Sequence, residues 1–482
     1  MSASSTPPTP ALPSTGSRRD PVALALLALA LLVGSLVFVR LGQWSLWIDE
    51  AFTLHDSLWA EGQRNPLGYR VLGAFYRILG VEDGHRPDEL GLRLLPAILG
   101  WAGVPLTFWA FRRAAGDRAA AAAALLVAAS SWHLYWSQNA RFYTLVQDLV
   151  LLGSGLGLRS MWGRSWSLLV LALGAFAMAA LTHPTAALAG GAFLAGLLLV
   201  GLTSTRPPGF VGGRAKLLIG LVAVGVLVGL WWGPPILRSW RLAKGGGTPV
   251  HLLLTTGFFV TPILGAAALL GGWLALARRD TFGRLALTVV VLGMVQALAI
   301  SLYARFTAQY MFAFLPWFAI LATWHLRPAA TEPRSGPLAL GLVGILTVSG
   351  LADEMLYLTS RRGERPAWRE AYRYVWNERR ADDQVFGMAA PVAEYYLEPA
   401  KTDVSDVTAI SYLDAFRSRV PEKWARTGRR AWFVLNPEEL MDWKAEDRTA
   451  FREMLAQDCR LVRSWPLYIE SRDMSVEVYL RE

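Results

Sequence analysis

Long apolar segments are the feature that most restricts the fold of this chain. Residues 21 to 357 contain about eleven of them, most near the roughly 20 residues that a helix needs to cross a bilayer. Only 17% of all residues are charged, whereas a soluble chain has roughly 25%. The sequence therefore predicts a polytopic α-helical membrane protein. The expected spans are residues 21–39, 94–111, 119–132, 142–158, 166–181, 185–202, 217–232, 255–276, 285–303, 310–324 and 338–357.

The distribution of basic residues predicts the orientation in the membrane. Residues 1–20 form a Ser/Thr/Pro/Ala-rich tail that should be disordered, and Arg18 and Arg19 near its end favour a cytoplasmic N-terminus. Every short inner loop then carries basic residues, which accounts for the net charge of +10 without nucleic-acid binding. An odd number of spans places loop 41–92 and the C-terminus outside. We expect a multi-pass protein of the bacterial inner membrane, embedded in its lipid bilayer.

The composition changes after the last apolar segment. Residues 359–482 are rich in charge and contain no spanning segment, so we expect a periplasmic domain that follows the transmembrane domain of residues 21–358. Alternation of helical and short apolar strand patterns predicts an α/β fold. The expected helices are 369–378 and 447–457, and the expected strands are 383–388, 430–435, 459–467 and 476–480. The single cysteine, Cys459, excludes an intramolecular disulfide framework.

An acidic pair follows the first span. Asp49 and Glu50 lie among aromatic residues at a membrane face, where carboxylates lose hydration at a cost in free energy. One interpretation is a simple helix start, because acidic side chains are favoured near a helix N-terminus. The other is a functional carboxylate at the membrane surface.

Six short motifs occur in an order that resembles a known family. They are WIDEA at 47–51, NPLGY at 65–69, RLLPA at 93–97, SQNARFY at 137–143, YMFAFLP at 310–316 and PAWREA at 366–371. The ordered set resembles the GT-C membrane glycosyltransferases, and is similar to the group of protein O-mannosyltransferases and lipid A aminoarabinose transferases (glycosyltransferase family 39-like). The chain departs from that pattern at Asn65, where the family has a basic residue, and at Gln309, where Arg is common.

The resemblance implies transfer of a sugar from a polyprenyl-phosphate donor to an acceptor on the outer face, with inversion at the anomeric carbon. Asp49 would act as the base that deprotonates the acceptor. Glu50 would join it in the catalytic loop, by orienting neighbouring loops or by binding the acceptor. Arg141, Arg305 and Arg64 would bind the donor phosphate, although arginines beside aromatic residues also anchor helices at the interface.

Further candidates accompany these residues. Asp148 lies seven residues after Arg141, a spacing that would put both on one helix face, although a packing pair would explain a buried Asp equally well. His183 lies in a predicted outer turn and could contact a substrate or simply shape the turn. The remaining candidates come from the family motifs and are Tyr143, Asn65 and Tyr310.

Cofactor, acceptor and alternative functions remain open at this stage. Carboxylates at the site could hold a divalent metal ion, but the sequence requires none, and the scattered histidines do not predict a zinc site. The acceptor could be a glycolipid, a polysaccharide or a protein. A lipid transporter or flippase would also be polytopic, but it should show an inverted repeat, which the sequence does not display. A non-catalytic polyprenyl-phosphate-binding protein is the other alternative.

Overall fold

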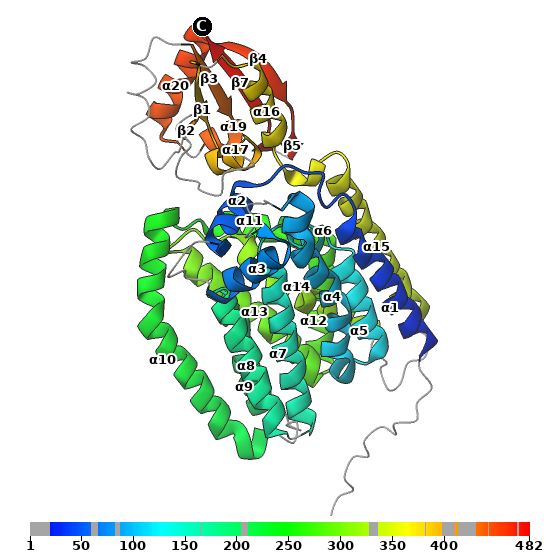
Figure 1. The fold of residues 1–482 in the computed structure, drawn as a ribbon. Coiled ribbons are helices and arrows are strands. Elements are labelled where there is room, and N and C mark those ends of the chain that lie inside the picture. The colour runs from blue at the N-terminus through cyan, green and yellow to red at the C-terminus, as the bar shows by residue number, and fades with distance from the viewer. Residues whose placement is uncertain are drawn as a thin grey trace, which may run out of the picture.

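The computed structural model describes residues 20–58, 66–81, 87–163, 165–203, 211–326, 336–380, 382–397, 410–412, 430–441, 443–469 and 472–482. Helices before residue 359 form a bundle, and a small sheet with its own helices stands at one end of that bundle (Figure 1). The predicted tail up to residue 19, and the candidates Arg64 and Asn65, lie outside the described residues.

All of the apolar segments predicted from the sequence coincide with helices. The helices are Pro21–Gly34 (α1), Ile48–Leu58 (α2), Pro66–Ile78 (α3), Glu89–Ala115 (α4), Asp117–Ala128 (α5), Ser131–Ser137 (α6), Tyr143–Gly163 (α7), Trp166–Thr182 (α8), Ala186–Thr203 (α9), Val211–Lys244 (α10), Pro249–Val260 (α11), Pro262–Ala277 (α12), Thr281–Ser301 (α13), Leu315–Ala322 (α14) and Gly336–Leu358 (α15). Short 3-10 turns occupy Ser35–Phe38 (η1), Ala308–Phe314 (η3), Trp324–Leu326 (η4) and Arg362–Glu364 (η6).

The number of clear membrane spans is smaller than the eleven segments predicted. Among the described residues, six helices are long and apolar enough to cross a membrane, or up to eight if each bent pair is one span. Two of the predicted spans are broken, between α5 and α6 by 63° and between α11 and α12 by 92°. The second break has a local cause, because Pro262 starts α12 and cannot continue the hydrogen bonding of α11. The predicted class of polytopic helical membrane protein is confirmed.

The sheet at the end of the bundle has the predicted α/β character. Its elements are Trp368–Glu378 (α16), Gln384–Gly387 (β1), Ala390–Leu397 (α17), Ile410–Tyr412 (β2), Ala431–Leu435 (β3), Pro437–Leu440 (α19), Ala445–Asp458 (α20), Arg460–Trp465 (β4), Tyr468–Ile469 (β5), Arg472–Asp473 (β6) and Val476–Arg481 (β7). The strand order is β2-β1-β3-β7-β4, with β1 parallel to β2 and β3, and β7 antiparallel to β3 and β4. Every residue of β3 is buried, as expected for a central strand covered on both faces.

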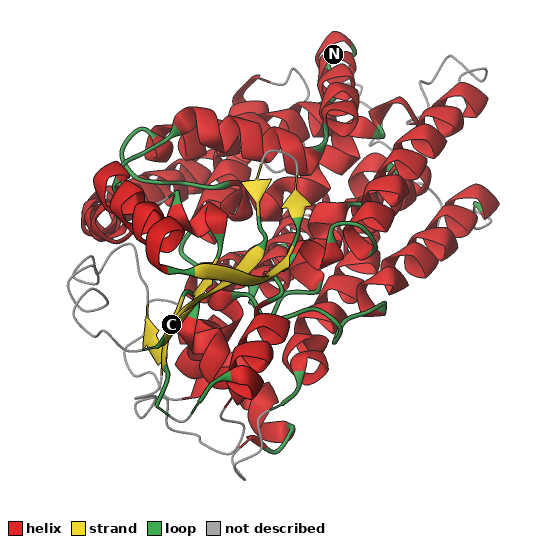
Figure 2. Cartoon of the chain, turned by 90° about the horizontal axis from the view of Figure 1, so that it is seen from above, coloured by secondary structure: helices red, strands yellow, loops and turns green. Residues whose placement is uncertain are grey.

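The sheet region is attached to the segment between α1 and α4. Arg369 donates from Nη1 to Glu89 Oε1 at 2.8 Å and from Nη2 to the carbonyl of Gln43 at 2.7 Å. A second contact is apolar, since Trp47 packs against a small cluster around Ile469. Seen from above, the sheet lies over the helices of the bundle (Figure 2). The acidic pair therefore lies between the bundle and the sheet region.

Candidate functional site

Helix α2 begins at the acidic pair and directs its two carboxylates differently. The backbone N–H of Trp47 donates to Glu50 Oε2 at 2.8 Å, which caps the start of α2. Acidic residues in a first turn also interact favourably with the helix dipole. The side chain of Glu50 is fully buried, whereas that of Asp49 is half-buried. Both residues thus lie in the first turn of a helix, as the helix-start interpretation predicts. Of the two carboxylates, only that of Asp49 is accessible to solvent.

Glu50 is the centre of a buried ionic network. It accepts hydrogen bonds from Nε and Nη2 of Arg93, both at 2.8 Å, and Nε of Arg365 lies 3.5 Å from Oε2. Burial alone would raise the pKa of Glu50, but Arg93 and Arg365 lower that pKa to about 2. A carboxylate that stays charged and fully engaged is a poor proton acceptor. Of the roles predicted for Glu50, the geometry favours orientation of neighbouring loops.

The same carboxylate positions the loop that carries Arg141. Oε1 of Glu50 accepts the backbone N–H of Ala140 at 2.8 Å. Arg141 then donates from Nη1 to the carbonyl of Asp49 at 3.2 Å and to Thr53 Oγ1 at 2.6 Å. Glu50 and Ala140 are 90 residues apart in the sequence. One buried carboxylate thus holds the start of α2 and the loop before α7 together. Glu50 therefore fixes Arg141 beside Asp49.

Asp49 and Arg141 each keep unused polar groups at this point. The carboxylate of Asp49 makes no hydrogen bond or ion pair with the part of the chain that the structure describes. Nε of Arg141 is buried and likewise has no hydrogen-bond partner there. Burial alone would lower the pKa of Arg141, but the nearby Asp49 carboxylate raises it overall, so the guanidinium is permanently charged. A carboxylate and a guanidinium that both have polar atoms without partners among the described residues thus lie together.

An aromatic cluster borders Arg141. The guanidinium carbon lies 5.8 Å from the Tyr143 ring centroid, and the His183 ring lies 5.7 Å from the same ring. His183 stacks on Tyr310 at 5.3 Å, and Tyr310 stacks on Trp240 at 5.2 Å. Tyr310 is within electrostatic range of both Asp49 and Arg141. The structure therefore brings together the predicted site residues Asp49, Arg141, Tyr143, His183 and Tyr310.

His183 is held in a defined orientation within this cluster. Its Nδ1 lies 2.6 Å from Thr185 Oγ1, in the turn between α8 and α9. The turn predicted from Pro184 is thus present, and the ring also packs against the aromatic cluster.

The structure places Asp148 elsewhere, so its predicted alignment with Arg141 is wrong. Helix α7 begins at Tyr143, and Arg141 therefore precedes the helix whose face it was expected to share. The Asp148 carboxylate lies against α4, where Oδ1 is 2.7 Å from the position that a Cβ atom on Gly103 would occupy. This oxygen is buried and has no partner among the described residues.

Arg305 lies at the edge of the aromatic cluster. Its backbone N–H donates to the carbonyl of Gly245 at 3.4 Å. The next residue, Phe306, packs on Tyr310 with ring centroids 4.9 Å apart. Arg64 and Asn65 precede α3 outside the described residues, so their predicted roles stay predictions.

Two arginines that contact Glu50 were not predicted as site residues. Arg93 belongs to the RLLPA motif and Arg365 directly precedes the PAWREA motif, yet neither was connected with Glu50. A signal existed for Arg93, because it directly precedes the predicted apolar span 94–111, and an arginine at such a position needs a partner or contact with water. The identity of that partner, 43 residues away, depends on the tertiary structure. Among the described residues, no three His, Cys, Asp or Glu side chains lie close enough together to hold a metal ion.

Fold and site together define a polytopic membrane protein with a polar site at the end of its bundle, beneath a small α/β sheet region. Comparisons with known proteins agree with this class. No protein-family model matches the chain, and curated proteins also give no match.

Solved structures do match. The crystal structure of ArnT from Cupriavidus metallidurans bound to undecaprenyl phosphate covers 95% of this chain and 97% of its own, with a TM-score of 0.50 at 15% identity. The archaeal oligosaccharyltransferase AglB from Archaeoglobus fulgidus, in complex with an inhibitory peptide and a dolichol-phosphate, has a TM-score of 0.51 at 14% identity, over 81% of this chain and 61% of its own. The chain thus has the GT-C fold that was expected from its motifs.

Proposed function

We propose that this protein is an inverting glycosyltransferase that moves a sugar from a polyprenyl-phosphate donor to an acceptor hydroxyl. The observation that carries the proposal is the pairing of Asp49, with its uncommitted carboxylate, and Arg141, with its uncommitted Nε, at one end of the bundle. Two proteins of similar fold support the donor class, because one was crystallised with undecaprenyl phosphate and the other was solved with a dolichol-phosphate.

The chemistry assigns one task to each of these two residues. Arg141 binds the phosphate of the donor, on which negative charge grows as the bond between the sugar carbon and the phosphate oxygen breaks. Asp49 accepts the proton of the acceptor hydroxyl as that oxygen forms its bond to the same carbon. The phosphate leaves with the electron pair of the broken bond. Among the described residues, the neighbouring carboxylate of Glu50 is held by Arg93 and is not placed to act as a nucleophile, so the proposed reaction is a single displacement at the sugar carbon, with inversion.

The aromatic cluster lies beside Arg141, and the sheet region lies over the loop that holds Asp49. The rings of Tyr143, His183 and Tyr310 pack against one another beside Arg141, and this buried cluster supports the side of the site next to the guanidinium. The region after residue 359 covers the loop that holds Asp49 and would act as a periplasmic domain that receives the acceptor. In this proposal the protein lies in the inner membrane with its site on the outer face, consistent with the basic inner loops.

Replacement of Arg141 by Ala should weaken donor binding by about tenfold or more, because a charge-assisted contact to phosphate contributes roughly 1.5–3 kcal/mol. Binding of undecaprenyl phosphate to the purified protein measures this directly. Arg241→Ala is the matched control, since Arg241 is exposed on α10 and should leave binding unchanged. Equal affinity of the Arg141 variant and the wild type would assign Arg141 to interfacial anchoring.

The proposed function itself is tested in a deletion strain of the source bacterium. Mass spectrometry should detect loss of one glycan modification on envelope glycolipids, polysaccharides or proteins, and the wild-type gene should restore it. The fraction that changes identifies the acceptor class. An unchanged set of glycans would contradict the proposal. Accumulation of an intact lipid-linked sugar on the inner leaflet would instead identify a flippase.

A further inference from the structure

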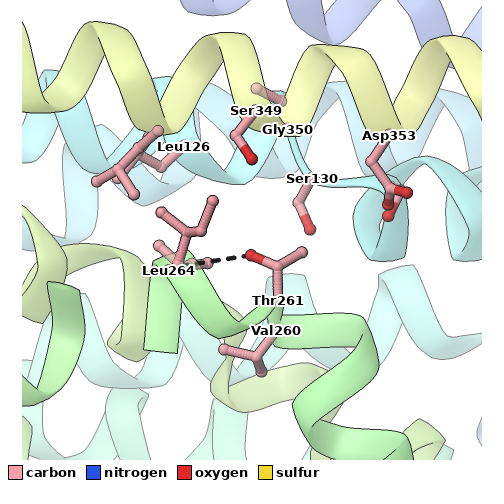
Figure 3. A pocket seen from close by; sticks show the side chains of 12 residues that line it. Leu126, Ser130, Val260, Thr261, Leu264, Ser349, Gly350 and Asp353 are labelled. Atoms are coloured by element: carbon pink, nitrogen blue, oxygen red, sulfur yellow. Dashed lines mark hydrogen bonds between the residues drawn. The ribbon is translucent and has the colours of Figure 1, made fainter. Parts of the chain in front are cut away.

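A small polar pocket lies between three helical segments of the bundle (Figure 3). Two of its walls are the breaks in predicted spans, one between α5 and α6 and the other between α11 and α12. The third wall is the second half of α15. The residues that line the pocket differ from those around Asp49, and the proposed glycosyl transfer uses none of them.

The size of the pocket restricts what it can hold. Gly350 of α15 packs directly on the end of α5, since a Cβ atom added there would lie 2.0 Å from the carbonyl oxygen of Ala129. This close approach leaves a cavity of about 20 Å³. A single water molecule needs about 10–15 Å³. The pocket therefore has room for one water molecule and for no organic ligand.

Each wall contributes one hydroxyl group to this space. Ser130 directly precedes α6, Thr261 lies at the junction of α11 and α12, and Ser349 belongs to α15. Figure 3 shows their side-chain oxygens around one space, with Asp353 to the side. The hydroxyls of Ser130 and Ser349 make no hydrogen bond with the described part of the chain. Thr261 Oγ1 accepts the N–H of Leu264 at 3.4 Å, but its own proton is donated to none of the described residues.

The backbone at Thr261 also favours a ligand at this point. Its φ is 63°, in the left-handed region that a β-branched residue rarely adopts. Such a conformation persists only where neighbouring groups hold it in place. The 3.4 Å bond from Leu264 is long for an N–H donor, and Pro262 has no N–H to contribute. A partner for the Thr261 hydroxyl would supply a further stabilising contact.

The lining favours water over a cation. Hydroxyl groups both donate and accept hydrogen bonds, and a buried water molecule typically makes about three of them. The carboxylate of the lining, Asp353, is instead paired with Arg361, whose Nη1 lies 2.9 Å from Oδ1. A cation in the pocket would compete with that guanidinium for the carboxylate and would be repelled by it.

We propose that one ordered water molecule occupies this pocket and bridges the hydroxyls of Ser130, Thr261 and Ser349. The two breaks interrupt the helical hydrogen bonding of their spans, and the water joins both breaks to α15. It thereby fixes the direction in which α6 leaves the end of α5. Because α6 leads to the loop that carries Arg141, the water stabilises the bundle beside the candidate site.

Structure determination of the full-length protein in lipid nanodiscs, at a resolution that shows ordered water, tests the proposal directly. Density for one water molecule should lie within hydrogen-bonding distance of all three hydroxyl oxygens. The double variant Ser130→Ala, Ser349→Ala should lose this density, because the water would keep only one of its three side-chain partners. Absence of the density in the wild type would overturn the proposal, and so would oxygen contacts as short as those of a metal ion.

Unfolding in SDS provides a second test, and it needs no sugar donor, so its outcome is independent of glycosyl transfer. Ser130→Ala and Ser349→Ala should each raise the unfolding equilibrium constant by about fivefold, the usual effect of one lost hydrogen bond. The two side chains do not bond each other directly, so a shared water should make the double variant clearly milder than the roughly 25-fold product.

Thr347→Val is the matched control for this coupling. The Thr347 hydroxyl donates to the carbonyl of Val343 within α15, so its loss should multiply with that of Ser130→Ala. Effects that multiply in the same way for Ser130→Ala and Ser349→Ala would contradict the proposal.

Discussion

Replacement of Asp49 by Asn should reduce sugar transfer by about 10²–10⁴-fold, which is the usual contribution of a general base. Asn keeps the shape of the side chain but cannot accept the proton of the acceptor hydroxyl. The carbonyl of Asp49 would still receive the hydrogen bond from Arg141, so the loop geometry should persist. Donor binding should therefore stay close to that of the wild type. Transfer is measured with the donor and acceptor identified from the deletion strain.

A matched control lies on the same helix. Asp56 is also on α2, its side chain is 27% exposed, and it pairs with the exposed His55. Asp56→Asn should leave transfer unchanged, which separates a loss of basicity from a general loss of negative charge on α2. Full activity of Asp49→Asn would refute Asp49 as the base. Loss of donor binding together with transfer would point to a positioning role instead.

Replacement of Glu50 by Gln should destabilise the protein by about 3–5 kcal/mol, the usual cost of leaving a buried charge without its partner. Arg93 and Arg365 would face each other without a carboxylate, and both side chains are almost completely buried. The melting temperature in detergent measures the loss. Glu482→Gln breaks a pair that is 71–79% exposed and should have almost no effect, because exposed pairs contribute little.

A double variant distinguishes this ionic role from simple packing. Arg93→Met in the Glu50→Gln background removes one of the uncompensated cations, so part of the lost stability should return. Additive losses in the double variant would show that the two side chains act separately. Because Glu50 also holds the N–H of Ala140, the single variant should further lower donor affinity through displacement of Arg141.

Glu50 also predicts a pH dependence of stability. The pKa of Glu50 is about 2 in the folded protein, against an ordinary value of 4.5. The lowered value means that Glu50 stabilises the fold fully above pH 4.5, and that this contribution is lost as the pH falls from about 4.5 towards 2. The melting temperature of the wild type should decrease over that interval. Glu50→Gln should lack this component, and an identical pH profile in both proteins would contradict the assignment.

Much of the architecture could be predicted from the sequence, because its causes are local. An apolar segment of sufficient length must become a helix in a bilayer, and the order of such segments is visible in the chain itself. The strands at 384–387, 431–435 and 476–481 were also predictable from short apolar runs. The breaks between α5 and α6 and between α11 and α12 were not, because composition alone does not reveal where an apolar segment bends.

The same distinction between local and tertiary causes applies to the candidate site. Sequence alone determined that Asp49 and Arg141 follow apolar segments at membrane faces, since polarity and length are properties of the chain. Only the tertiary structure decided that Glu50 is buried among arginines whereas Asp49 stays half-buried. Adjacent carboxylates on one helix point in different directions, and only folding brings Arg93, Arg365 and the N–H of Ala140 around one of them. The buried carboxylate of Glu50 thereby connects three segments of the chain, whereas the half-buried carboxylate of Asp49 stays accessible, as the proposed role of a base requires.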